Sequence, residues 1–67
     1  MQVNTARIRG LMAEHGDTQQ DLAEKLGITP ATLREYLKGR QQMRVDTVSQ
    51  IAAIYNVSPL DLLTIEK

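Results

Sequence analysis

Few residues in this chain have the types and spacing that catalysis or metal binding requires. The single histidine, His15, stands beside Gly16 at a predicted helix end. We expect it to interact with exposed helix carbonyls rather than to act as a ligand or base. The chain contains no cysteine, which excludes disulfides and thiolate metal sites. Since no carboxylate pair or hydroxyl–imidazole pair stands out either, we expect no enzyme, no metal and no cofactor.

The charged residues point instead to a possible contact with phosphates. Eight basic residues balance eight acidic ones, so net charge alone gives no support to nucleic-acid binding. The charged residues of the segment 14–24 are all acidic. The segment 34–44 instead has four basic residues and one acidic residue, a net charge of +3. The four bases are Arg34, Lys38, Arg40 and Arg44. Such a cationic end can face a DNA backbone, although an ordinary surface of mixed charge explains the same pattern.

Size and composition restrict the classes of protein that remain. With 67 residues, the chain forms one domain, residues 1–67, with a modest core. It has 42% hydrophobic residues and no Phe or Trp, so Leu, Ile, Val, Ala and Met must fill that core. No apolar stretch reaches the roughly 20 residues that span a membrane, and the first residues lack the apolar segment of a signal peptide. We therefore expect a cytoplasmic protein without a membrane partner.

Glycines, prolines and capping residues divide the chain into five short helices, which predicts an all-α fold. Hydroxyl or amide side chains can cap four helix starts, at Asn4 or Thr5, Thr18, Thr29 and Ser58. Residues that tolerate a left-handed backbone stand at four helix ends: Gly16, Gly27, Gly39 and Asn56. Apolar residues recur at helical spacing between these points, with Tyr36 and Tyr55 among those predicted for the core. No period-two run suggests a strand.

The segment 19–38 meets the requirements of a helix-turn-helix unit. Two helices that cross steeply need a small residue at their closest approach, and Ala23 fits that position. Four residues later, Gly27 can supply the positive φ of the turn. Pro30 falls at the start of the second helix, where proline is tolerated. A generic helix pair needs an apolar stripe but not this combination, so the pattern favours a DNA-binding unit.

Residues 8–63 resemble the Cro/C1-type, lambda-repressor-like helix-turn-helix family, which includes phage repressors, restriction–modification controllers and small bacterial regulators. The resemblance rests on Ile8-Arg9 and Leu11, the run Thr18 to Thr29, Leu33, Gly39-Arg40, Asp46-Thr47-Val48 and Val57 to Leu63. It implies a compact five-helix fold and sequence-specific binding of double-stranded DNA by a repressor-like transcriptional regulator. Either a whole small regulator or the N-terminal part of a longer one fits the pattern.

The resemblance also implies roles for individual positions. The helix of residues 30–38 would enter the major groove and present base-reading residues, namely Pro30, Ala31, Thr32, Arg34 and Glu35. Other positions would contact phosphates: Gln19, Thr29, Lys38, Arg40 and Arg44. Arg34 and Lys38 lie one helical turn apart and can reach either a base edge or a phosphate.

This sequence departs from the family pattern at several of these positions. Pro30 and Ala31 offer no bidentate partner for a base, and only apolar contact with thymine methyl groups is open to them. Glu35 can accept from cytosine N4 but would repel a nearby phosphate. Met43 stands where relatives often have proline, and Leu37 stands where an acid is frequent. These departures affect the target sequence rather than the fold.

The end of the chain raises the question of a homodimer. If Leu60 and Leu63 of the last predicted helix face the core, Leu62 and Ile65 point elsewhere. An exposed Leu–Ile pair suggests a self-association surface, and a twofold dimer would read a near-palindromic site. Packing of the chain end explains the pair equally well. The alternative to DNA binding is a protein-interaction module on the same fold, which the zero net charge and donor-poor reading face favour.

Overall fold

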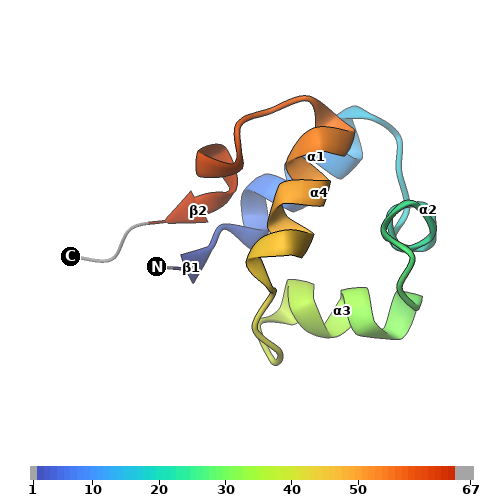
Figure 1. Cartoon of the computed structure of the whole chain (residues 1–67). Coiled ribbons are helices and arrows are strands. Elements are labelled where there is room, and N and C mark those ends of the chain that lie inside the picture. Colours follow the sequence, from blue (N-terminus) through green and yellow to red (C-terminus); the bar gives the residue numbers. More distant parts are fainter. Residues whose placement is uncertain (1, 65–67) are drawn as a thin grey trace.

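A computed structural model describes residues 2–64 and places four α-helices around one core (Figure 1). In chain order the elements are β1 (Gln2–Val3), α1 (Thr5–Glu14), α2 (Gln19–Leu26), α3 (Pro30–Lys38), α4 (Val45–Tyr55), the 3-10 helix η1 (Pro59–Leu62) and β2 (Leu63–Thr64). The predicted all-α architecture is therefore confirmed for the body of the molecule. None of the helices within residues 2–64 is long and apolar enough to cross a membrane.

Local capping chemistry explains where the helices begin and end. The Asn4 side chain accepts a hydrogen bond from the Arg7 N–H at 3.0 Å and so starts α1. After α1, the His15 Nδ1 lies 2.9 Å from the Leu11 carbonyl oxygen, which confirms its predicted contact with a helix carbonyl. Asn56 ends α4 with a φ of +56°, the left-handed conformation predicted for it.

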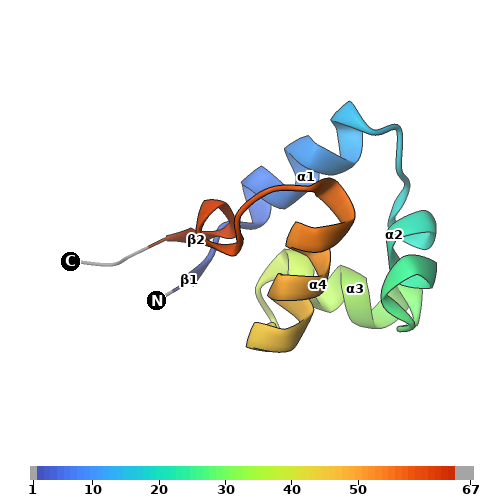
Figure 2. The same cartoon turned by 45° about the horizontal axis from the view of Figure 1, so that its top comes forward.

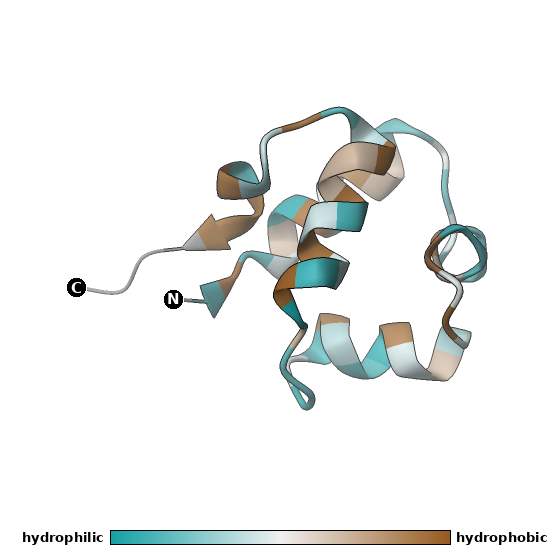
Figure 3. Ribbon diagram, viewed as in Figure 1, coloured by the Kyte–Doolittle hydropathy of each residue, from teal (hydrophilic) through white to brown (hydrophobic). Residues whose placement is uncertain are grey.

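The core lies where the four α-helices and η1 meet. Figure 3 shows hydrophobic bands alternating with polar ones along the helices, as expected when one side of each helix is buried. Tyr36 and Tyr55 are both buried, which confirms the prediction that they fill the core. The most completely buried side chains are Ile8, Leu11, Leu22, Leu33, Ile51 and Leu62. Close packing of these residues stabilises the fold, because the chain has no cysteine to form a disulfide.

The predicted count of five α-helices is not confirmed, although a short helix does begin after Ser58, as expected. The chain forms only the short 3-10 helix η1 and then the strand β2, which pairs antiparallel with β1, Val3 opposite Leu63. The Asn4 N–H also donates to the Leu62 carbonyl oxygen at 2.7 Å. This pairing satisfies backbone groups that a longer helix would have satisfied within itself. The expectation of no strand is also wrong. Strands of only two residues leave no periodic pattern in the sequence from which they could be predicted.

The predicted orientation of Leu60 and Leu62 is wrong, whereas Leu63 is partly buried and packs against the core, as expected. Leu62 is fully buried, whereas Leu60 is 75% exposed. The expectation assumed that residues 60 and 63 lie one α-helical turn apart, but Leu63 already belongs to β2. Leu62 therefore does not contribute to an exposed dimer surface. Ile65, the other residue predicted for that surface, lies outside the described residues.

The elements are arranged so that the strands and α2 lie at opposite ends of the molecule. Both cartoon views place β1 and β2 at one end and α2 at the other (Figures 1 and 2). In Figure 1, α2 is viewed along its axis while α3 is viewed from the side, so these two helices cross steeply. One side of α3 consequently forms an edge of the molecule.

Candidate nucleic-acid interface

The turn between α2 and α3 has the geometry that its sequence predicted. Gly27 adopts a φ of +72°, a conformation that glycine reaches without strain. The Ile28 N–H donates to the Ala23 carbonyl oxygen at 3.0 Å, which closes the end of α2. The Ala23 side chain is fully buried. These observations confirm the left-handed glycine of the turn, and the buried Ala23 side chain agrees with its predicted place in the packing of α2.

The start of α3 is fixed by a hydroxyl cap. The Thr29 side chain accepts from the Thr32 N–H at 3.1 Å, and the two threonine hydroxyl oxygens lie 2.9 Å apart. Pro30 occupies the first turn, as predicted. One hydroxyl hydrogen is used between the two threonines, so the other remains free to donate to a ligand.

One side of α3 is exposed and the other is locked into the core. Leu33, Tyr36 and Leu37 are buried on the inner side. Four of the predicted DNA-contacting residues of α3 are exposed, and two, Thr32 and Glu35, are half-buried. The exposed four are Pro30, Ala31, Arg34 and Lys38. The predicted exposure of the face that begins at Pro30 is therefore confirmed.

The amino end of α2 offers free hydrogen-bond donors. The Thr18 hydroxyl accepts from the Asp21 N–H at 3.1 Å, and the Asp21 carboxylate accepts from the Thr18 N–H at 2.9 Å. This capping box leaves the N–H groups of Gln19 and Gln20 without an acceptor among the described residues. Two backbone donors at a helix N-terminus suit an anion such as a phosphate.

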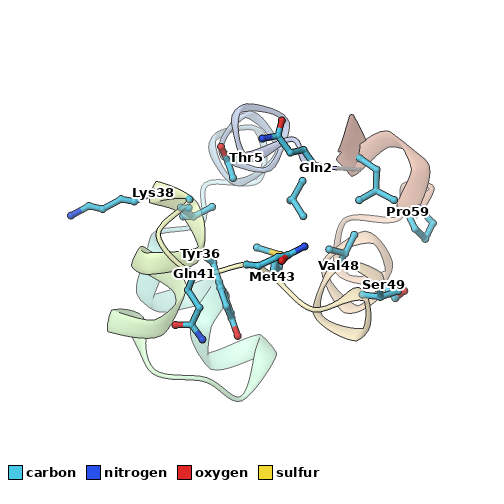
Figure 4. A pocket seen from close by; sticks show the side chains of 15 residues that line it. Gln2, Thr5, Tyr36, Lys38, Gln41, Met43, Val48, Ser49 and Pro59 are labelled. Carbon is cyan, nitrogen blue, oxygen red and sulfur yellow. The ribbon is translucent and has the colours of Figure 1, made fainter. Parts of the chain in front are cut away.

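The four bases of the segment 34–44 are exposed, and three of them form no ion pair among the described residues. The side chains of Arg34, Lys38 and Arg44 are exposed and form no ion pair with any residue in the described range 2–64. In Figure 4 the Lys38 side chain, at the end of α3, extends away from the pocket that the figure draws. Arg40 is 69% exposed, and its guanidinium lies 3.9 Å from the Glu35 carboxylate. The local excess of positive charge is thus directed outward.

The Glu35 carboxylate is less available for contact with a DNA base than the sequence suggested. Its side chain is 41% exposed, but the oxygen nearest Arg40 is shielded from solvent and has no hydrogen-bond partner among the described residues. At 3.9 Å the pair is an electrostatic contact rather than a hydrogen bond. Arg40 therefore offsets the negative charge that Glu35 would otherwise present to DNA.

A groove of about 610 Å³ separates the end of α3 from the strands and the start of α4 (Figure 4). Its lining includes Tyr36, Met43 and Val48, all largely buried. Polar side chains such as Gln41 and Ser49 line it as well. Met43, which stands where relatives often have proline, is buried here. The groove brings none of the predicted base-reading residues together.

Two contacts near the interface were not predicted. The Arg9 guanidinium donates to the Leu37 carbonyl oxygen at 3.3 Å and ties α1 to the last turn of α3. The Asp17 carboxylate accepts from the Tyr55 hydroxyl at 2.9 Å, across 38 positions of the chain. Neither contact has a local sequence signal, because each joins residues that only the tertiary fold brings together.

Comparisons with known proteins agree with this geometry. A family model described as the Cro/C1-type HTH DNA-binding domain matches residues 7–67. A protein of Thermococcus kodakarensis, named "Putative HTH-type transcriptional regulatory protein", is 29% identical over 66 residues, which are 94% of this chain and 21% of that relative. The chain therefore spans about a fifth of the relative's length. No solved structure matches the chain. The chain belongs to the Cro/C1-type HTH DNA-binding domain family, which is a DNA-binding family and not an enzyme class.

Proposed function

We propose that this domain, residues 1–67 with its helix-turn-helix unit at 19–38, binds duplex DNA sequence-specifically within a repressor-like transcriptional regulator. The observation that carries the proposal is the placement of α3. Its inner side is fixed in the core while Ala31, Arg34 and Lys38 are exposed on its outer side. A rigid helix with such an exposed side can enter the major groove, which is wide enough for an α-helix.

Base reading is assigned to the first two turns of α3. Arg34 is the residue best suited to a bidentate contact with guanine, because its guanidinium is exposed and unpaired within the described chain. Pro30 and Ala31 contribute apolar contact with thymine methyl groups, and the threonine hydroxyl that is free to donate can reach a base or a phosphate. Glu35 accepts from cytosine N4 when Arg40 turns to a phosphate.

Phosphate binding is assigned to both ends of this surface. Gln19 and the free N–H groups at the start of α2 hold one phosphate. Thr29, Lys38, Arg40 and Arg44 hold the backbone around α3. The three cationic residues of this set predict that the logarithm of the affinity falls against the logarithm of the salt concentration with a slope of about −2.7.

Homodimerisation stays a prediction, and it no longer includes Leu62. A twofold dimer would require a near-palindromic target. The symmetry of the DNA sequences that the domain selects from a random pool therefore tests for a dimer. Sedimentation of the free domain gives the same information independently.

The proposal is tested by binding-site selection from a random duplex pool, followed by affinity measurements on the selected duplex at two salt concentrations. We expect one preferred sequence and a steep loss of affinity as salt rises. A protein-interaction module on the same fold would show no duplex affinity even at low salt. Binding to all duplexes alike would support DNA binding but contradict base reading by α3.

A further inference from the structure

A small polar cluster joins the turn before α2 to the ends of α2 and α4. The Asp17 side chain is 10% exposed. Its carboxylate accepts two hydrogen bonds from the Lys25 ammonium, at 2.9 and 3.1 Å, and one from the Tyr55 hydroxyl at 2.9 Å. Charge-assisted bonds of these lengths are among the strong ones in proteins. Residues from α2 and from α4 thus converge on one carboxylate.

The surroundings hold this carboxylate in place. The Asp17 N–H donates to the Met12 carbonyl oxygen at 2.8 Å, which fixes the backbone after α1. The Tyr55 ring is only 4% exposed and lies 4.8 Å from the His15 ring, centroid to centroid. Burial, and then the bond to Asp17, raise the pKa of Tyr55 above its usual value, so its hydroxyl stays a donor. The Asp17 backbone and the Tyr55 side chain are therefore both held in place.

The cluster adjoins the predicted phosphate contact. Thr18, which caps α2, is the next residue along the chain, and Gln19 follows it. Tyr55 stands at the last turn of α4, on an element that contributes no residue to the proposed DNA surface except near its start. The bond between Tyr55 and Asp17 consequently fixes the amino end of α2 against the rigid body of the domain.

We infer that Asp17 is a positioning residue for DNA binding, held by Tyr55 and Lys25 so that Gln19 and the free N–H groups of α2 meet a phosphate. The inference rests on the proposed function. Asp17 itself touches no DNA, and its charge is already matched by Lys25. It acts on the phosphate only through the orientation of the α2 start, whose geometry must be held to a fraction of an ångström.

Simple electrostatics predicts the opposite effect of removing this residue. Asp17→Ala deletes a negative charge and releases the Lys25 ammonium, and both changes favour a polyanion. If Asp17 had no positioning role, the variant would bind DNA as tightly as the unaltered protein or more tightly. A positioning role predicts weaker binding, so the sign of the change separates the two explanations.

The test measures the affinity of the full domain for its selected duplex, at a temperature where circular dichroism shows every variant folded. We expect Asp17→Ala to weaken binding about tenfold. Tyr55→Phe keeps the buried ring and all charges, and we expect it to weaken binding about threefold. The matched control is Asp61→Ala, because the exposed Asp61 carboxylate makes no hydrogen bond or ion pair within residues 2–64. This control should bind at least as tightly as the unaltered protein.

A double-mutant cycle with Gln19→Ala shows whether the effect passes through the phosphate contact. We expect Asp17→Ala to cause a clearly smaller loss once Gln19 is truncated, because one of the phosphate contacts that Asp17 positions, the Gln19 side chain, is then already gone while the backbone N–H groups remain. Tight binding by Asp17→Ala, or losses that simply add in the double variant, would overturn the inference. If the unaltered domain binds no duplex at low salt, the proposed function fails. If it binds duplex but Asp17→Ala and Tyr55→Phe bind equally well, only the positioning role fails.

Discussion

The Tyr55 hydroxyl donates to the Asp17 carboxylate at 2.9 Å and thereby joins the end of α4 to the turn that precedes α2. Asp17 also accepts from Lys25, in the last turn of α2. The helix-turn-helix unit is therefore held to the rest of the domain by a polar contact as well as by apolar packing. This contact has consequences for stability that can be measured without DNA.

Stability should depend on pH through Asp17. The hydrogen bond from Lys25, and then that from Tyr55, lower the pKa of the Asp17 carboxyl below its usual value. A lowered pKa in the folded state stabilises the protein above the unfolded value of about 4 and loses that effect as the pH falls through the lower folded value. We therefore expect urea unfolding to show an advantage of the unaltered protein over Asp17→Asn at pH 6 that shrinks towards pH 2.

The titratable groups that act on this carboxylate are Lys25, Tyr55 and His15. Lys25→Met removes the largest cause of the lowered pKa, so the advantage over Asp17→Asn should be smaller when both proteins carry that change. An advantage that stays constant between pH 6 and pH 2 would mean that the Asp17 bonds do not stabilise the folded state.

Leu62 and Leu60 form a matched pair that tests the observed end of the chain. Leu62 is fully buried and Leu60 is 75% exposed. Leu62→Ala should lower the free energy of unfolding by about 2–5 kcal/mol, because it leaves a cavity in the core. Leu60→Ala should change it by less than about 0.5 kcal/mol. Urea denaturation measures both values, and equal losses would show that η1 is placed wrongly.

Substitutions at two glycines separate the cost of a left-handed backbone from the cost of a steric clash. A Cβ added at Gly27 or at Gly10 would meet no atom within 4 Å. Gly27 has a φ of +72°, so Gly27→Ala should destabilise the domain by about 1 kcal/mol or more. Gly10 lies inside α1, where alanine is preferred, and Gly10→Ala should stabilise by about 0.5–1 kcal/mol. Thermal unfolding shifts of the same sign in both variants would contradict the left-handed turn.

Base reading and phosphate binding should respond differently to substitution. Arg34→Ala should relax the preference for one base position, whereas Lys38→Ala should weaken binding to all sequences and reduce the salt slope by about 1. Glu35→Gln should alter the selected sequence, while Gln19→Ala and Arg40→Ala should leave it unchanged and lower the affinity. Selection experiments with each variant make the comparison. An unchanged preferred site for both Arg34→Ala and Glu35→Gln would contradict the placement of α3.

The helix ends of this domain could be predicted because they depend on neighbouring residues. The reciprocal bonds of Thr18 and Asp21, and the left-handed Gly27, involve at most a few consecutive positions. The exposed side of α3 could be predicted in the same way. Consecutive residues of a helix point in different directions, so a buried Leu33 leaves Arg34 on the exposed side.

The remaining features depend on residues that lie far apart in the chain. Val3 pairs with Leu63 across almost the whole sequence, and strands of two residues leave no alternating pattern. The 3-10 form of η1 reversed the expected orientation of Leu60 and Leu62. The ion pair of Glu35 with Arg40 depends on how the chain turns after α3. Side-chain contacts of this kind are set by tertiary packing rather than by local preference.

The central claim, that the exposed side of α3 and the start of α2 together form the DNA surface, is tested most directly by NMR. The domain labelled with ¹⁵N is titrated with its selected duplex, and the backbone amide shifts are followed residue by residue. We expect the largest changes at Gln19, Gln20 and residues 31–38. Changes confined to the groove around Met43 and the strands, with α3 unaffected, would contradict the account.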